Sequence, residues 1–176
     1  CEENQHPRIH EDLFAKYEMP LARKPGDEMS YCNFNYRLLG EIVRRLGGQS
    51  LAEFAEDRVF QPLGMRDTHY IVPESAKSRV VKRPAYAPYQ ELFADWMMDC
   101  PSASDGLYSS AADIATFGQM FLNGGTYGGN RVLSSPTVAA MTRNQVPGIA
   151  ATFAGQAQPE ADWGYGWNIY GGDEWK

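Results

Sequence analysis

Apolar residues recur every three or four positions along the segment 33–47, and charged residues occupy the opposite side of the same period. This spacing is typical of an amphipathic helix that turns one face toward a core, and it predicts a helix over 33–47. Gly47 and Gly48 follow the last apolar residue. A glycine at this point commonly takes the left-handed conformation that ends a helix, and we expect Gly47 to do so.

Three further segments with the same period predict helices over 50–61, 111–123 and 136–143. The first two begin with the pattern of a capping box, in which a serine and an acidic residue three positions later bond each other's backbone amides. The two pairs are Ser50 with Glu53 and Ser110 with Asp113. Ser135 and Pro136 are expected to begin the third helix. A short helix over 10–19 is a further expectation.

Signals for strands are few. The β-branched residues of 68–72 predict one short strand, and the alternating large residues of 163–170 predict another. The segment 73–103 shows no clear period, and long irregular segments inside compact domains are usually functional or mobile. The fold class that this pattern predicts is mainly α with a few short strands.

The length of 176 residues suits one domain. We therefore expect a single domain or fragment over 1–176, with a helical lobe over 25–145 and a loop and strand over 146–176. The 16 basic and 22 acidic residues give a net charge of -6, which disfavours nucleic acid as a partner because phosphates are bound by positive surfaces. No apolar run approaches 18 residues, so no transmembrane helix is expected.

Patterns that would hold a metal or a cofactor are weak. His6 and His10 stand four residues apart, but Pro7 lies between them and the pattern His-Glu-x-x-His does not occur. The glycine pairs lack the lysine and serine of a phosphate-binding loop. The three cysteines are too scattered for a zinc site: Cys1, Cys32 and Cys100. We expect no cofactor and no metal.

A search for a nucleophile gives no complete motif. The sequence contains no Gly-x-Ser-x-Gly elbow, and no serine or threonine is followed three residues later by lysine. No Lys-Thr-Gly, Lys-Ser-Gly or His-x-Gly triplet occurs either. Cys32 could act as a nucleophile only with a partner histidine. Cys100 is expected to be a buried, inert thiol.

An ordered set of short motifs nevertheless runs through the segment 25–70. The set consists of Pro25-Gly26, Tyr31-Cys32-Asn33, Asn35-Tyr36, Leu38-Leu39-Gly40, and Pro62-Leu63-Gly64-Met65 with Asp67-Thr68. It continues in GLYSSAADIATFGQMFLNGG, in LSSPTVAAMTRNQ and in the GYGW of 164–167. Together these motifs resemble the serine β-lactamase and penicillin-binding-protein-like superfamily, in the branch of class C β-lactamases, DD-carboxypeptidases and related esterases.

The resemblance implies a fold and two site residues. The fold would be the helical lobe of the β-lactamase/transpeptidase-like α/β fold, with an incomplete sheet. Tyr31 matches the tyrosine of the family's Tyr-x-Asn motif, which carries a proton to and from the nucleophilic serine. Asn33 matches the asparagine that bonds the catalytic lysine or the substrate amide. On a structural interpretation Tyr31 is a packed tyrosine and Asn33 only caps the helix, and we expect Asn33 to serve as the N-cap in either case.

The sequence also departs from the family pattern. Only 30 residues precede Tyr31, and they supply no Ser-x-x-Lys motif; the third motif, which normally follows the GYGW strand, is also missing. We therefore expect a central fragment of a serine hydrolase whose parent forms an acyl-enzyme from a β-lactam, a D-amino peptide or an ester. The fragment itself is expected to be inactive. The alternatives are a catalytically dead helical module that binds a peptide or partner, and a cysteine hydrolase that uses Cys32.

Partners and location follow from the same resemblance. The parent would take a small-molecule or peptide substrate, and it would be a bacterial protein that is periplasmic or exported. The segment 73–103 is expected to form a specificity wall, because it is long, irregular and rich in aromatic residues: Tyr86, Tyr89, Phe93 and Trp96. If 163–170 is a strand with an open edge, we also expect self-association through it.

Overall fold

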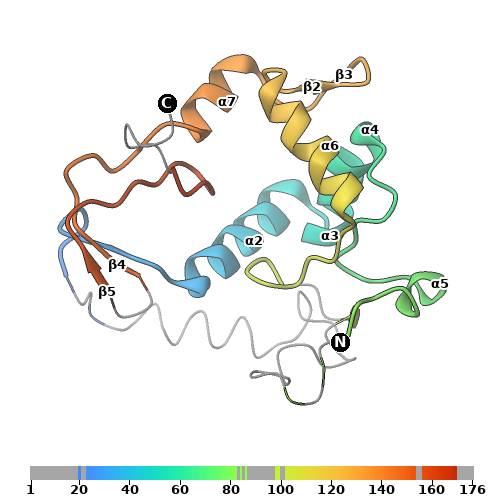
Figure 1. Ribbon diagram of the computed structural model, residues 1–176, viewed down its shortest axis with the longest axis horizontal. Helices are drawn as coiled ribbons and strands as arrows, with labels where there is room; N and C mark the ends of the chain where they lie inside the picture. The colour runs from blue at the N-terminus through green and yellow to red at the C-terminus, as the bar shows by residue number, and fades with distance from the viewer. Residues whose placement is uncertain are drawn as a thin grey trace. The chain divides into compact units, whose positions relative to one another are not determined.

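The computed structural model describes residues 20, 23–82, 84, 86, 98–99, 102–153 and 156–169 (Figure 1). The chain divides into two compact units. The first consists of Cys1–Met19 and Asn33–Gly118, and the second of Pro20–Cys32 and Gln119–Lys176. The predicted helix over 10–19 lies outside the described residues, and the expected single domain stays a prediction.

The first unit begins with helix α2 (Asn33–Gly47), which has the bounds that the apolar period predicts. Gly47 is its last helical residue, and the left-handed conformation falls on Gly48, whose φ is +69°. The prediction for Gly47 was therefore wrong by one position. The Gly48 amide still donates to the Arg44 carbonyl at 3.0 Å, so this glycine satisfies one of the last carbonyl groups of the helix.

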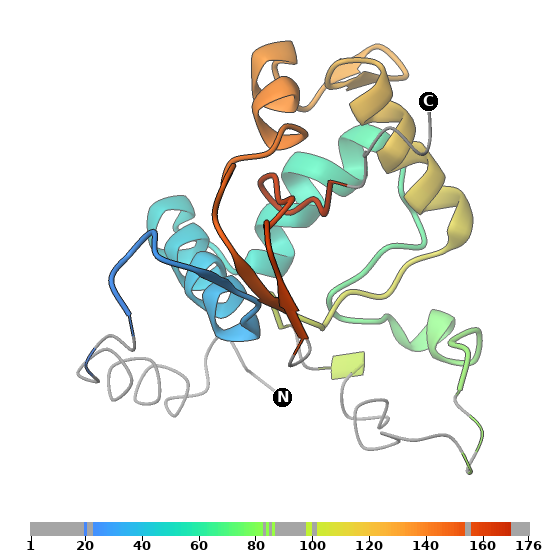
Figure 2. The same cartoon turned by 60° about the vertical axis from the view of Figure 1, so that its left-hand side comes forward.

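The predicted helix over 50–61 forms as three consecutive pieces: α3 (Leu51–Ala55), the π-helical turn η1 (Glu56–Phe60) and α4 (Gln61–Leu63). Figure 2 shows this part of the chain as a coiled ribbon. Its capping box is confirmed. The Ser50 hydroxyl accepts from the Glu53 amide at 3.2 Å, and the Glu53 carboxylate accepts from the Ser50 amide at 2.8 Å. Gly64, with φ of +69°, ends the segment.

The strand predicted at 68–72 is wrong. The structure has only an isolated bridge there, in which His69 and Tyr108 exchange backbone hydrogen bonds of 2.8 and 2.9 Å. The neighbouring amides bond to different parts of the chain: Asp67 donates to the Asp113 carboxylate, and Val72 donates to the Met98 carbonyl. Because these bonds have no common partner strand, no ladder forms.

The segment 73–103, predicted to be irregular, contains the short helix α5 (Glu74–Lys77). Lys77 forms ion pairs with Glu74 at 3.2 Å and with Asp99 at 2.9 Å. These bonds connect α5 to a residue near the end of the segment. Tyr89, Phe93 and Trp96 of the expected specificity wall lie outside the described residues.

Helix α6 (Ala111–Leu122) begins in the first unit, and its last residues belong to the second. Of the two hydrogen bonds in its predicted capping box, the one to the serine hydroxyl is confirmed and the one to the acidic side chain is wrong. The Ser110 hydroxyl accepts from the Asp113 amide at 3.2 Å. The Asp113 carboxylate, however, accepts from the Asp67 amide and from the Thr68 hydroxyl, each at 2.8 Å. The start of α6 is thereby fixed to the turn that follows α4.

The second unit contains a three-stranded sheet in the order β1–β4–β5, with β1 parallel to β4 and β4 antiparallel to β5. These strands are β1 (Met29–Ser30), β4 (Ala151–Phe153) and β5 (Gln156–Gln158). The hairpin of β2 (Thr126–Tyr127) and β3 (Asn130–Arg131) follows α6 and leads to α7 (Ser135–Met141). The N-cap of α7 is Ser134, not Ser135, because the Ser134 hydroxyl accepts from the Thr137 amide.

The strand predicted at 163–170 is also wrong. Trp163 and Asn168 form an isolated bridge around a tight turn, in which the Gly164 amide donates to the Trp167 carbonyl at 2.8 Å. Gly166 makes the turn possible, because its φ of +80° lies in the region that favours glycine. The argument for an open strand edge therefore no longer applies to 163–169, and self-association through this segment stays a prediction.

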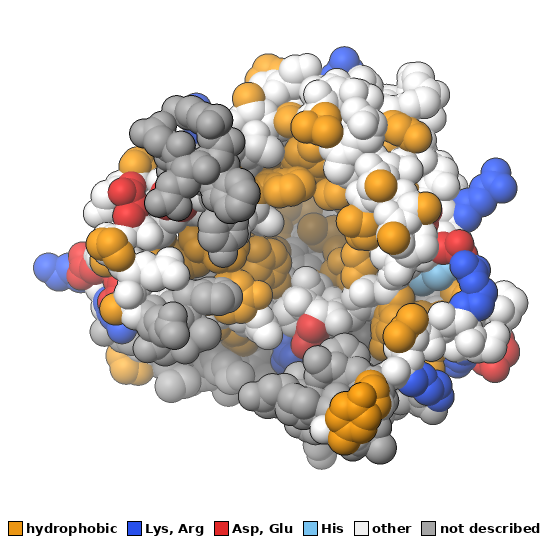
Figure 3. Space-filling view, viewed as in Figure 1, with side chains coloured by type: hydrophobic (Ala, Val, Ile, Leu, Met, Phe, Trp, Pro, Cys, Tyr) orange, Lys and Arg blue, Asp and Glu red, His pale blue; other side chains and the backbone are white. Residues whose placement is uncertain are grey.

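Large hydrophobic side chains reach the surface of both units, and they are visible over much of the face shown in Figure 3. The exposed ones include three residues of the predicted core face of α2: Leu39, Ile42 and Leu46. Buried hydrophobic residues include Phe60, Leu63, Met120, Phe121 and Ala161. Within the described part of the chain, no helix has the length and apolar character needed to cross a membrane.

Two helical glycines form a matched pair for a test of packing. A Cβ added at Gly40 in α2 would lie 2.8 Å from the Ala103 Cβ, whereas a Cβ added at Gly118 in α6 would have no neighbour within 4 Å. We expect Gly118→Ala to raise the free energy of unfolding by up to about 1 kcal/mol, because alanine favours the helix. Gly40→Ala should lower it by about 1 kcal/mol or more, because overpacking outweighs that gain. Urea unfolding of both variants measures the difference, and equal stabilisation would contradict the tight packing of Gly40.

Candidate functional site

Tyr31 directly follows strand β1 in the second unit. The Met29 amide donates to the Ala150 carbonyl at 2.8 Å, and the Tyr31 amide donates to the Thr152 carbonyl at 3.4 Å. The backbone at Tyr31 is thus held by the pairing of β1 with β4. The side chain remains 46% exposed.

Side-chain bonds strengthen the same strand pairing. The Thr152 hydroxyl donates to the Glu28 carboxylate at 2.6 Å, and Arg23 forms an ion pair with the other oxygen of Glu28 at 2.9 Å. The bond of Thr152 connects the residue before β1 to β4, and the Arg23 ion pair holds the same carboxylate. They hold the short strand in register although it contains only two residues.

Asn33 is the first residue of α2 and belongs to the first unit. The expected N-cap role is therefore wrong, because Asn33 is already helical and the cap position precedes it. Its side chain is exposed at the start of the helix. Cys32 is the last residue of the second unit before the chain enters the first unit at Asn33. It is an exposed free cysteine, and its use as a nucleophile stays a prediction.

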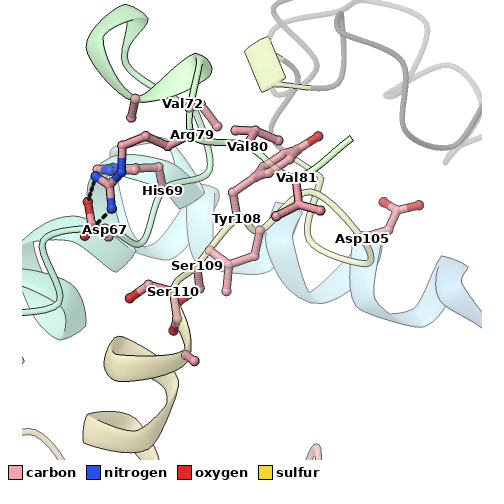
Figure 4. Close-up of a pocket in the computed structure, with 13 residues that line it drawn as sticks. Asp67, His69, Val72, Arg79, Val80, Val81, Asp105, Tyr108, Ser109 and Ser110 are labelled. Atoms are coloured by element: carbon pink, nitrogen blue, oxygen red, sulfur yellow. Dashed lines mark hydrogen bonds and ion pairs between the residues drawn. The ribbon is translucent and has the colours of Figure 1, made fainter. Parts of the chain in front are cut away.

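A pocket of about 540 Å³ lies within the first unit, and the motifs of the sequence did not predict it (Figure 4). Its polar lining includes Asp67, His69 and Arg79, and its apolar lining includes Val72 and Val80. The Arg79 guanidinium binds both carboxylate oxygens of Asp67, at 2.6 and 2.9 Å. A fixed ion pair thus lies at one wall of this pocket. Asp67 and Arg79 are 12 residues apart in the chain, so only the fold brings them together.

Two hydroxyl groups at this pocket, one of them buried, form a chain of hydrogen bonds with Asp113. Thr68 is fully buried and donates to Asp113, and its oxygen lies 2.7 Å from the Ser109 hydroxyl. Neither Ser109 nor Ser110 is followed three residues later by lysine, so neither has the sequence context of the family's nucleophile. We assign this chain of bonds to the packing of α6, since every hydroxyl in it has a partner.

The ionisable groups of the segment 67–79 differ in environment. Hydrogen bonds from Arg79 hold the pKa of Asp67 below its usual value, and the same bonds raise the pKa of Arg79. Burial raises the pKa of Tyr70, so this phenol stays protonated at neutral pH. Among the described residues, no group of three or more His, Cys, Asp and Glu side chains is placed to hold a metal ion.

The chain matches the Beta-lactamase family over residues 5–175, and it therefore belongs to that family. It is 36% identical over 160 residues to penicillin-binding protein 4 of Amycolatopsis lactamdurans, a match that covers 85% of this chain and 39% of that protein. The family comprises serine hydrolases of the β-lactamase and penicillin-binding-protein type, as the motif set in the sequence indicated.

Solved structures agree in fold. A penicillin-binding protein homologue from Caulobacter crescentus aligns with a TM-score of 0.67 and 22% identity, over 90% of this chain and 48% of that one. A β-lactamase from Mycobacterium bovis aligns with a TM-score of 0.58 and 25% identity, over 82% of this chain and 42% of that one. The fold class predicted from the sequence, a largely helical part of the β-lactamase/transpeptidase-like fold, is thereby confirmed. The chain spans about two fifths of the length of the curated relatives it matches.

The ion pair at the pocket predicts a pH dependence. Because the pKa of Asp67 is lowered in the folded chain, its contribution to stability is present above the unfolded pKa and is lost as the pH falls through the folded pKa. We expect Arg79→Gln to return the Asp67 pKa toward its ordinary value, which carboxyl ¹³C NMR would detect. Arg66→Gln is the control, since Arg66 is exposed and precedes Asp67 in the chain. An unchanged Asp67 titration in Arg79→Gln would contradict the ion pair.

Proposed function

We propose that this chain is the segment of a serine hydrolase that supplies Tyr31 and Asn33 to the active site, and that the complete protein forms an acyl-enzyme. The substrate would be a β-lactam, a D-amino peptide or an ester. The observation that supports this most strongly is the placement of Tyr31. Its backbone is held by the β1–β4 pairing while nearly half of its side chain stays exposed, directly before the helix that begins with Asn33.

The chemistry assigned to Tyr31 is proton transfer. A serine hydroxyl attacks the substrate carbonyl carbon, its proton passes to the Tyr31 oxygen, and Tyr31 then returns the proton to the departing nitrogen or oxygen. An isolated phenol has a pKa of about 10, so the ionised form needs a neighbouring cation to be populated at neutral pH. The lysine of a Ser-x-x-Lys motif would supply that cation.

Asn33 would form hydrogen bonds to the catalytic lysine or to the substrate, and it would not transfer a proton. Its side-chain amide has both a donor and an acceptor, so it can bond a lysine ammonium through its oxygen or a substrate amide through either group. Asn33 follows Tyr31 by two residues in the sequence. Its side-chain amide lies in the first turn of α2 and is exposed to solvent. We propose, on the same family grounds, that the complete protein is bacterial and periplasmic or exported.

A second candidate function is a catalytically dead helical module that binds a peptide or a partner. The exposed apolar residues of α2 favour it, because Leu39, Ile42 and Leu46 offer a hydrophobic surface. The complete reading frame separates the two candidates. A Ser-x-x-Lys motif upstream and a third motif downstream would support the enzyme, and their absence from the gene would support the binding module.

The 176-residue chain alone is expected to hydrolyse neither nitrocefin nor p-nitrophenyl acetate above background, because it contains no Ser-x-x-Lys motif. Purified wild-type chain and a Cys32→Ala variant should give the same background rate. Turnover that persists through purification and is lost in Cys32→Ala would instead identify Cys32 as the nucleophile.

In the complete protein, Tyr31→Phe should lower the acylation rate by about 10²- to 10⁴-fold, because it removes the proton carrier and keeps the ring. Its thermal unfolding midpoint should stay close to that of the wild type. Tyr165→Phe is the matched control, an exposed tyrosine of the same unit with no assigned role. Stopped-flow acylation by a chromogenic β-lactam or ester measures both variants, and a full acylation rate in Tyr31→Phe would refute the catalytic role.

A further inference from the structure

Trp163 packs against Tyr31 within the second unit. The centroids of the two rings lie 6.0 Å apart, and the ring planes are tilted by 44°. This separation falls within the range of favourable aromatic pairs. Tyr31 is 46% exposed, so part of its side chain stays accessible beside this ring contact.

The backbone contacts of Tyr31 do not by themselves fix the direction of its ring. Pairing of β1 with β4 sets the position of the Tyr31 Cα, but the rotamer of a side chain is set by the contacts of the side chain itself. A proton carrier must bring its oxygen within hydrogen-bond reach of the nucleophile. A displacement of about 1 Å can lower the rate by a factor of about 100. A neighbouring group that limits ring rotation would therefore affect the reaction.

Trp163 is anchored independently of Tyr31. Its carbonyl accepts from the Gln145 amide at 2.7 Å, and its amide donates to the Ala161 carbonyl at 3.1 Å. Ala161 is itself fully buried, and its amide donates to the Ile149 carbonyl at 2.7 Å. The backbone of Trp163 is thus bonded directly to Gln145, and its neighbour Ala161 is bonded to Ile149 of the same segment.

The next residue fixes the turn against the end of α7. A Cβ at Gly164 would lie only 2.0 Å from the Met141 carbonyl oxygen, so no other residue fits there without a shift of the backbone. The Tyr165 amide donates to the same carbonyl at 3.0 Å. These contacts leave the turn that carries Trp163 little freedom to move away from α7.

The turn also contains a second tryptophan with a different partner. Trp167 packs edge-on against Phe121, with ring centroids 4.8 Å apart and an angle of 64° between the planes. Trp163 and Trp167 are therefore the same residue type in the same turn, but they contact different rings. This gives a control for the loss of an indole.

We propose that Trp163 is a positioning residue for Tyr31, and that its indole holds the phenol ring in the orientation that proton transfer requires. This inference rests on the proposed function of Tyr31. Trp163 does not touch the reacting atoms in this assignment; it acts by limiting the rotation of the tyrosine ring.

The first test measures the order of the Tyr31 ring in the 176-residue chain by ¹³C NMR, with its signals assigned from Tyr31→Phe. Trp163→Ala should lower the order of this ring and abolish its cross-peaks to the indole, while the Met29 and Ser30 amide shifts stay near their wild-type values. Trp163→Phe should restore most of the order, because it keeps an aromatic face. Trp167→Ala should leave the Tyr31 ring unchanged. If Trp163→Ala does not fold, Trp163→Leu replaces it, since it keeps apolar volume without the aromatic ring.

The second test measures acylation by the complete protein. Trp163→Ala should lower the acylation rate about ten-fold with little change in KM, and Trp163→Phe should recover it. A Tyr31 ring that stays ordered in Trp163→Ala, or an acylation rate that does not fall, would overturn the inference and leave the role of Tyr31 intact. A full rate in Tyr31→Phe would instead overturn the proposed function, and with it the positioning role. The two failures are thereby distinguished.

Discussion

The first unit depends on one carboxylate. Asp113 accepts hydrogen bonds from the amide of Asp67 and the hydroxyl of Thr68, which lie 46 and 45 residues earlier in the chain. Thr68 is completely buried, so this hydroxyl would be costly to leave without a partner. The bond joins the end of the α3–η1–α4 segment to the beginning of α6. Asp67, whose amide bonds to Asp113, also lines the pocket and forms the ion pair with Arg79 there.

In the second unit, the short strand β1 contains only two residues and is supported by side-chain bonds. β1 has few backbone bonds of its own, and the bonds of Glu28 to Thr152 and Arg23 add side-chain support where the ladder is short. Tyr31 stands directly after this strand. In its proposed role, Tyr31 would combine a fixed backbone with an accessible phenol, and sites built on strands hold their side chains more precisely than sites built on loops.

The sequence predicted helices more reliably than strands, and the reason is physical. The bounds of α2 and the capping box of Ser50 with Glu53 depend on residues within one or two turns, so a local pattern describes them fully. The segments at 68–72 and 163–170 have residues that suit strands, but a strand also needs a partner, and no local pattern supplies one. The contact of Trp163 with Tyr31 could not be predicted for the same reason, because it joins residues from distant parts of the chain. Tyr31 and Asn33 were found only through a family motif.

The π-helical turn η1 has a consequence for how relatives of this chain should be aligned. A π-turn accommodates one residue more than an α-turn over the same length of axis. A homologue with one residue fewer between Ser50 and Pro62 could therefore keep both the capping box and the Pro-Leu-Gly-Met turn in their places. A single-residue gap in an alignment of this helix would then mark the loss of the wide turn. It would not indicate a shift in the register of the flanking motifs.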